Sequence, residues 1–176
     1  MAGLLHDVLE DLHPDDRETR ARFKDVFPEL KNAPDDPDGF KASLETFIET
    51  QFGPETTRLV AAVTERKEIE GKQRPWRERK DEQLEHLRKA PQDVVLLKVA
   101  DALHNASSVL TDLRVHGKAV FSRFNAEAGD ILWWYESIVK IASERLPLER
   151  HAIALECEDV IRTLRDEAAA AGCLKN

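Results

Sequence analysis

The sequence contains few glycines and prolines and no long apolar run. Seven glycines and eight prolines in 176 residues, alongside plentiful Leu, Ala, Glu, Lys and Arg, favour helices. No apolar run approaches the roughly 20 residues that a helix needs to span a bilayer. The first residues also lack the basic start, apolar stretch and cleavage site of a signal peptide. We therefore expect a cytoplasmic protein that does not associate with membranes.

Cysteine is also scarce, and basic residues are fewer than acidic ones. Cys157 and Cys173 do not stand at a spacing typical of metal ligands, which indicates two reduced thiols. The 26 Lys and Arg residues are outnumbered by 34 Asp and Glu, so the formal net charge is −8. This balance argues against nucleic-acid binding, which favours a basic surface. A small anionic substrate remains compatible with it, because a local basic pocket or a metal can attract such a molecule.

Apolar residues recur at helical spacing along most of the chain. This periodicity predicts helices over 15–27, 40–50, 54–66, 75–89, 92–114, 130–145 and 148–170, and no stretch alternates convincingly with period two. The helix over 40–50 would turn Leu44, Phe47 and Ile48 to one face, and a loop is expected around Gly71. The helix over 92–114 is apolar on nearly every side until Leu103 and should be the central, buried helix. We therefore predict an all-α fold, with residues 1–176 forming a single domain. Segment 12–39 is acidic and rich in turn formers, and we expect a loop over 32–39. Segment 148–176 would form a C-terminal helix and tail.

Charged side chains interrupt apolar sequence at two distant places. His6 and Asp7 end a short apolar run, and Asp101 stands within the apolar stretch 94–100. Charged groups in apolar surroundings are costly unless something pairs with them. A divalent cation is an economical partner for one histidine and two aspartates, and this ligand set suits Mn²⁺ better than structural zinc.

Further polar residues stand at helical spacing from these three. Glu10 and Asp11 follow the His-Asp pair by about one turn, on the same side. Asn105 is four residues after Asp101, and Ser108 is one turn further. The spacing therefore groups acidic and polar side chains around both halves of the expected metal site.

Two segments carry a resemblance to a known family. Residues 5–11, Leu-His-Asp-Val-Leu-Glu-Asp, resemble the His-Asp-x-x-Glu-Asp motif of the HD superfamily of metal-dependent phosphohydrolases. Residues 97–105, Leu-Lys-Val-Ala-Asp-Ala-Leu-His-Asn, resemble a Lys-hydrophobic-Ala-Asp-x-x-x-Asn signature. Both are most similar to the hydrolase domain of RelA/SpoT-type alarmone enzymes and their small stand-alone relatives. The resemblance covers roughly residues 1–145, with the two motifs in the same order.

The resemblance implies a compact helical domain that holds one divalent ion, typically manganese. Its reaction removes the 3′-pyrophosphate of guanosine tetra- or pentaphosphate, the alarmones of the stringent response. Carried over position by position, the metal ligands would be His6, Asp7 and Asp101, while Glu10 and Asp11 would orient or deprotonate the attacking water. The residues implied to contact the nucleotide are Asn105, Ser108 and Lys98.

This family also uses a histidine on a helix well upstream of its His-Asp pair. The sequence begins five residues before His6, so we expect the fold to lack its first helix or helices and the ion to lack one ligand. Apolar surface left by the missing helices could be covered by homo-oligomerisation. Leu12, where the alarmone branch often has threonine, and Ala102, where a basic residue is common, leave the exact substrate open.

Two hypotheses of different class follow from these observations. The first is a metal-dependent phosphohydrolase that acts on the alarmone or a related nucleotide. The second is a truncated or degenerate HD domain without activity, which binds a nucleotide or another protein.

Simpler interpretations of single residues also stay open. Asp101 could be a buried aspartate paired with Lys98 or Arg114, and Asn105 could bond a neighbouring backbone group. The basic residues between 72 and 80 could meet substrate phosphates or form a solvated helix face. The aromatic residues 133–135 are expected to pack in the core.

Overall fold

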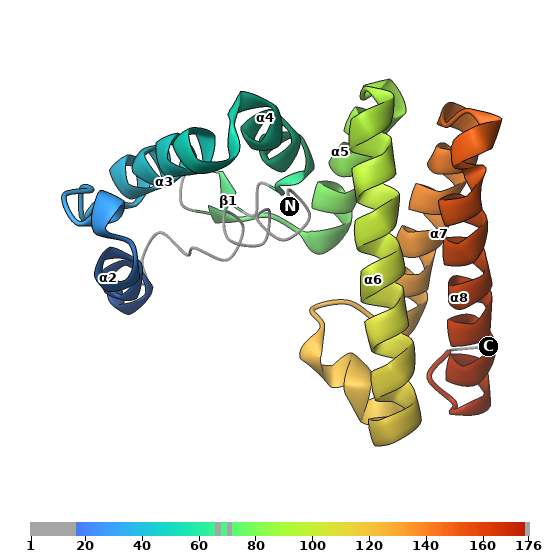
Figure 1. Ribbon diagram of the computed structural model, residues 1–176. Coiled ribbons are helices and arrows are strands. Elements are labelled where there is room, and N and C mark those ends of the chain that lie inside the picture. Colours follow the sequence, from blue (N-terminus) through green and yellow to red (C-terminus); the bar gives the residue numbers. More distant parts are fainter. Residues whose placement is uncertain (1–16, 66–67, 70–71, 175–176) are drawn as a thin grey trace. The chain divides into compact units, whose positions relative to one another are not determined.

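The computed structural model describes residues 17–65, 68–69 and 72–174. These residues form seven α-helices, three short 3₁₀ segments and one minimal hairpin (Figure 1). The all-α prediction is therefore confirmed. The chain divides into two compact units, Met1–Lys67 and Glu68–Asn176. No helix among the described residues is both long and apolar enough to cross a membrane.

The first unit is a small helical assembly with an aromatic centre. In chain order it contains α2 (Arg17–Val26), the 3₁₀ segment η1 (Pro28–Leu30), α3 (Pro37–Phe52) and α4 (Pro54–Val63). Phe23 of α2 meets Phe40 of α3 edge to face, with ring centroids 6.4 Å apart. Leu44 and Ile48 of α3, which the apolar periodicity predicted to face inward, are both buried. This contact between α2 and α3 builds the core of the unit.

Helix α3 begins three residues earlier than the sequence analysis placed it. The Oδ1 atom of Asp36 accepts a hydrogen bond of 2.8 Å from the backbone N–H of Gly39. Asp36 is thus the N-cap, and Pro37 takes the first helical position, where its missing N–H costs nothing. The predicted loop over 32–39 is wrong in its last three residues, because these turn-forming residues also start helices.

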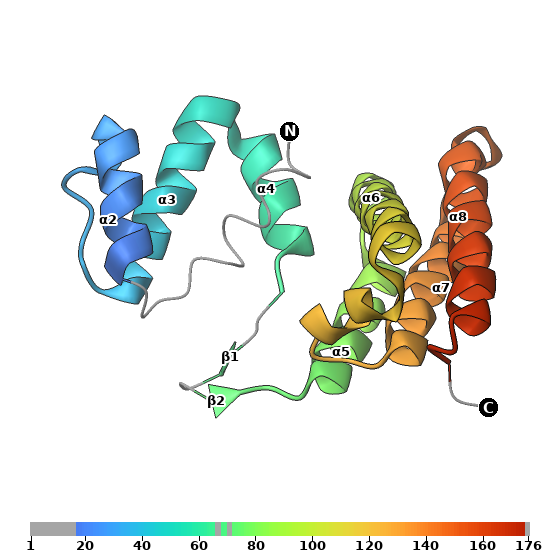
Figure 2. The same ribbon diagram turned by 90° about the horizontal axis from the view of Figure 1, so that it is seen from below.

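The second unit is larger and consists mostly of three long helices. It contains the hairpin strands β1 (Glu68–Ile69) and β2 (Lys72–Gln73), helix α5 (Trp76–Lys89), α6 (Gln92–His116), the 3₁₀ segment η2 (Gly117–Arg123), α7 (Ala128–Arg145), the 3₁₀ segment η3 (Leu148–Arg150) and α8 (His151–Ala170). The antiparallel strands pair Glu68 with Gln73 and Ile69 with Lys72 (Figure 2). Each strand is too short to show an alternating pattern, and for this reason the sequence predicted a loop there.

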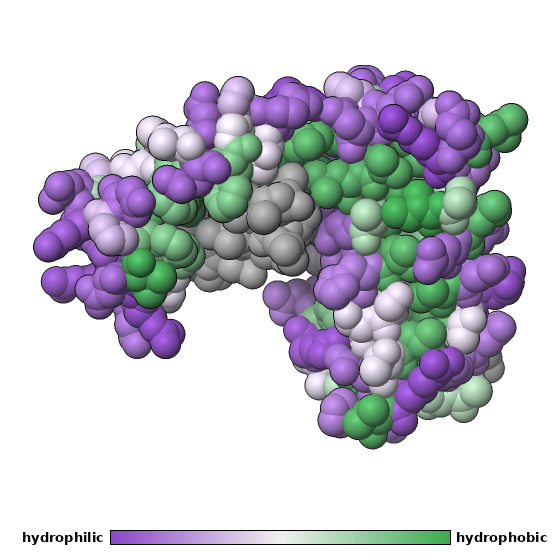
Figure 3. Space-filling model, in the orientation of Figure 1, coloured by the Kyte–Doolittle hydropathy of each residue, from purple (hydrophilic) through white to green (hydrophobic). Residues whose placement is uncertain are grey.

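Helix α6 forms the centre of this unit, as its apolar sequence predicted. It packs against both α7 and α8, and Figure 3 shows apolar residues along α6 and its junction with α8. Side chains of α6, α7 and α8 that are fully buried include Val95, Val99, Ala106, Leu132, Ile138, Cys157 and Leu164. A helix that is apolar on nearly all sides is stable only inside a packed assembly.

The two cysteines are free, as the sequence analysis expected. Cys157 is buried on α8, and this burial, with a smaller contribution from the negative charge of Glu156, raises the pKa of its thiol to about 12. A thiol with such a pKa stays protonated at neutral pH, so Cys157 acts as a small apolar core residue.

Gly117 is the C-cap of α6, and substitutions there test its backbone conformation. Its φ of +60° and ψ of −154° suit glycine alone. We expect Gly117→Ala to lower the free energy of unfolding by about 1–3 kcal/mol. Gly129 in α7 is a matched control, because an added Cβ meets no atom within 4 Å at either position. Gly129→Ala should instead raise stability by up to about 1 kcal/mol in urea denaturation. Equal effects of the two substitutions would contradict the assigned conformation of Gly117.

Candidate metal centre

The predicted site is divided between described and undescribed parts of the chain. The residues that lie outside the described ranges are His6, Asp7, Glu10 and Asp11. The remaining predicted site residues, Lys98, Asp101, Asn105 and Ser108, all lie on α6. The structure therefore describes one of the three predicted metal ligands, Asp101, together with its surroundings.

Asp101 is held by two side chains of its own helix. Its Oδ2 atom accepts a hydrogen bond from Lys98 Nζ at 3.1 Å, and its Oδ1 atom accepts one from Asn105 Nδ2 at 2.8 Å. The side chains of Lys98 and Asp101 are only 10% and 14% exposed. Because residues three and four apart share a helix face, the spacing of these three residues brings them together.

These contacts settle the alternatives that the sequence left open. The partner of Asp101 is Lys98, while Arg114 forms an ion pair of 2.6 Å with Glu167 on α8. Asn105 donates to a carboxylate and not to a backbone group. Ser108 is exposed, and its hydroxyl donates to the backbone carbonyl of His104 at 2.9 Å.

Two buried aromatic side chains of α7 border this cluster. The Trp134 ring centroid lies 5.7 Å from Lys98 Nζ and 4.7 Å from Lys80 Nζ of α5. Burial, and to a lesser extent the negative charge of Asp101, raise the pKa of the Tyr135 phenol. Both aromatic residues are core residues, as predicted. The approach of the Trp134 ring to Lys98 and Lys80 could not be predicted from the sequence, because helical periodicity carries no information on contacts between helices.

The basic residues near the start of α5 form local ion pairs. Arg74 bonds Glu78 at 2.9 Å and also bonds Glu82. The guanidinium carbon of Arg77 lies 3.3 Å from the centroid of the Trp133 ring. Its Nε atom forms an ion pair of 3.5 Å with Asp81 on the same helix. Arg74 and Arg77 are therefore engaged in local contacts, as expected for a charge-laced helix face.

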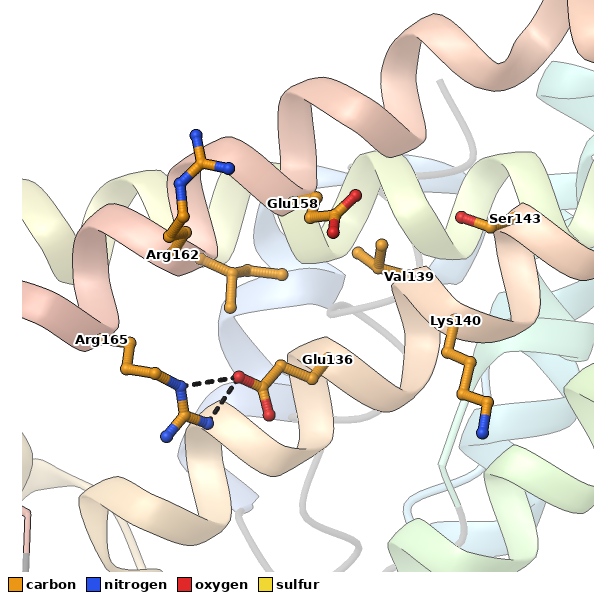
Figure 4. A pocket seen from close by; sticks show the side chains of 8 residues that line it. Glu136, Val139, Lys140, Ser143, Glu158, Arg162 and Arg165 are labelled. Carbon is orange, nitrogen blue, oxygen red and sulfur yellow. Dashed lines mark hydrogen bonds and ion pairs between the residues drawn. The ribbon is translucent and has the colours of Figure 1, made fainter.

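A separate groove lies between α7 and α8 (Figure 4). It measures about 470 Å³ and is lined by Glu136, Val139, Lys140, Ser143, Glu158, Ile161, Arg162 and Arg165. Glu136 accepts a hydrogen bond of 2.8 Å from Nε of Arg165 across the groove. No predicted site residue lines it, and its charged lining consists of three basic and two acidic side chains.

Asp101 has the chemistry of a metal ligand. Its carboxylate oxygens suit divalent cations such as Mn²⁺, and the hydrogen bonds from Lys98 and Asn105 resemble the supporting contacts that orient metal ligands in proteins. Among the described residues, no group of three or more His, Cys, Asp and Glu could hold a metal ion. Asp101 therefore has the donor chemistry of one metal ligand, and the other predicted ligands, His6 and Asp7, lie outside the described ranges.

Comparisons with known proteins identify the family. A crystal structure of lmo0812 from Listeria monocytogenes EGD-e is similar in fold, with a TM-score of 0.53 and 22% sequence identity, covering 92% of this chain and 99% of that chain. No curated protein sequence matches. A family model described as an HD domain matches residues 1–131. The chain therefore belongs to the HD-domain family, whose members are generally metal-dependent phosphohydrolases.

Proposed function

We propose that this protein is a metal-dependent phosphohydrolase that removes the 3′-pyrophosphate of guanosine tetra- or pentaphosphate, or hydrolyses a related nucleotide. Membership of the HD-domain family supports the reaction class. The observation that carries the proposal is the environment of Asp101. Its carboxylate is 14% exposed, lies on the central helix and is oriented at both oxygens by Lys98 and Asn105, as supporting contacts orient metal ligands in proteins.

The proposed centre combines Asp101 with His6 and Asp7, which lie outside the described residues. When bound, a divalent cation such as Mn²⁺ supplies charge neutralisation at the phosphate and a lowered pKa of water. Asp101 contributes an oriented carboxylate, since two donors fix both of its oxygens. The protein therefore does not need to reorganise this ligand when the site is loaded.

The remaining roles follow from the chemistry of the side chains. Glu10 and Asp11 would orient the attacking water and accept its proton. Asn105, which bonds Asp101, and Ser108, about one turn further along α6, are both exposed and can offer hydrogen bonds to the nucleotide. Water attacks the proximal phosphorus of the 3′-diphosphate, the bond from this phosphorus to the ribose 3′ oxygen breaks, and the 3′ oxygen takes up a proton. Guanosine diphosphate and pyrophosphate are then the products from the tetraphosphate.

Incubation of purified protein with Mn²⁺ and guanosine tetraphosphate tests this proposal. We expect guanosine diphosphate and pyrophosphate to appear in equal amounts, and their release to stop when EDTA removes the cation. Guanosine triphosphate, which has no 3′-diphosphate, is the matched control and should release no pyrophosphate. A panel of other 3′-phosphorylated nucleotides identifies the substrate within the class.

Absence of turnover would contradict the proposal. If metal-loaded protein turns over no nucleotide of this panel, the hydrolase proposal is wrong. A rise of the unfolding temperature with nucleotide but without turnover would then indicate the inactive, nucleotide-binding domain.

A further inference from the structure

Lys98 is nearly buried although it carries a full charge. Its side chain is 10% exposed, and lysine is almost never buried to this extent without a partner. The partner is Asp101, 3.1 Å from Nζ. With only one tenth of its side chain accessible, Lys98 offers little surface to a substrate and points its charge at a neighbouring side chain.

The Lys98 ammonium group is also contacted by a residue of another helix. The ring centroid of Trp134 on α7 lies 5.7 Å from Nζ, within the range of a cation–π interaction. Trp134 is itself buried, so its ring presents a fixed surface. Lys98 is therefore held between a carboxylate on α6 and an aromatic ring on α7.

The two donors to Asp101 differ in their exposure. Asn105 is exposed and can exchange its hydrogen bond with water, whereas Lys98 is shielded from water. Of these two described contacts, the one shielded from water is therefore that of Lys98.

We propose that Lys98 is a positioning residue, which acts through Asp101 by holding its carboxylate in the orientation that a divalent cation requires, and that it does not contact the substrate. The inference rests on the proposed function and replaces the nucleotide-binding role that the sequence analysis gave to Lys98. Groups that support a metal ligand typically change metal affinity by about 10–100-fold when they are removed.

The sign of the effect distinguishes positioning from simple charge. A lysine ammonium repels a cation through space, so loss of the charge alone would strengthen metal binding. Loss of a positioning contact would weaken it. The two effects of Lys98 on metal binding are therefore opposite. We infer that positioning is the larger one because the Lys98 ammonium is shielded from water and held between Asp101 and the Trp134 ring.

The test is a calorimetric titration of metal-free protein with Mn²⁺, combined with steady-state turnover. We expect Lys98→Met to weaken Mn²⁺ binding by about 10–100-fold, and Lys98→Arg, which keeps a charged donor, to restore most of the affinity. Lys118→Met, on an exposed residue of η2, is the matched control and should bind Mn²⁺ like the wild type. Thermal unfolding in EDTA verifies that each variant is folded, and Lys98→Gln repeats the test with a shorter neutral side chain.

Three outcomes would overturn this role of Lys98. The first is Mn²⁺ binding by Lys98→Met, or by Lys98→Gln, as tight as or tighter than that of the wild type. The second is unchanged metal affinity with a raised KM, which would show that Lys98 contacts the substrate. The third is failure of the wild-type protein to bind any divalent cation, which would contradict the proposed function as well. The first two leave the proposed function intact.

Discussion

Asp101→Asn is expected to weaken Mn²⁺ binding by at least about a hundredfold, since loss of groups that only support a ligand already costs 10–100-fold. Asparagine has the shape of aspartate but no charge, and only one of its two terminal atoms can bind a cation. Pyrophosphate release should fall below detection at Mn²⁺ concentrations that saturate the wild type. Calorimetric titration and a turnover assay at matched metal concentration measure the two effects.

The same helix provides a control for Asp101. Asp112 also lies on α6 and forms an ion pair of 2.6 Å with Arg123. Asp112→Asn removes the same charge from the same helix outside the predicted centre, and we expect metal affinity within about twofold of the wild type, as for an ordinary surface substitution. Wild-type metal affinity and turnover in Asp101→Asn would remove Asp101 from the centre.

The second large effect concerns the core of the second unit. Leu164 of α8 is completely buried, and we expect Leu164→Ala to lower the free energy of unfolding by about 2–5 kcal/mol, because it removes apolar contacts and leaves a cavity. The family match ends at residue 131, and α8 lies wholly beyond it. The substitution therefore tests whether this helix is an integral part of the fold.

Leu155 provides the comparison on the same helix. Its side chain is 59% exposed, so Leu155→Ala should change stability by no more than about 0.5 kcal/mol. Chemical denaturation of both variants, at constant metal concentration, gives the two values. Similar small losses for both would mean that α8 does not pack as the structure describes.

Much of the second unit could be predicted because its helices carry strong apolar patterns. The pattern over 92–114 indicated a central helix, and α6 spans Gln92–His116. The hairpin was missed because two-residue strands carry no periodicity, and the start of α3 was missed because Asp36 and Pro37 are typical of both loops and helix starts.

The contacts of the candidate site within α6 could be predicted from the sequence, but its contacts with other helices could not. The spacing of Lys98, Asp101 and Asn105 was sufficient to place them on one face of α6. The approach of Trp134 to Lys98 was not predictable, because periodicity shows which side of a helix is apolar but not which neighbouring helix covers it. For the same reason, spacing alone could not test whether His6 comes near Asp101.

A shared cation between His6 and Asp101 is the central claim, and a crystal grown with Mn²⁺ tests it most directly. Anomalous scattering should give one strong peak per chain, bonded at about 2 Å to the imidazole of His6 and to the carboxylate of Asp101. A peak bonded to neither side chain would contradict the account, as would a distance of more than ~10 Å between the two groups, far beyond twice a metal–ligand bond length.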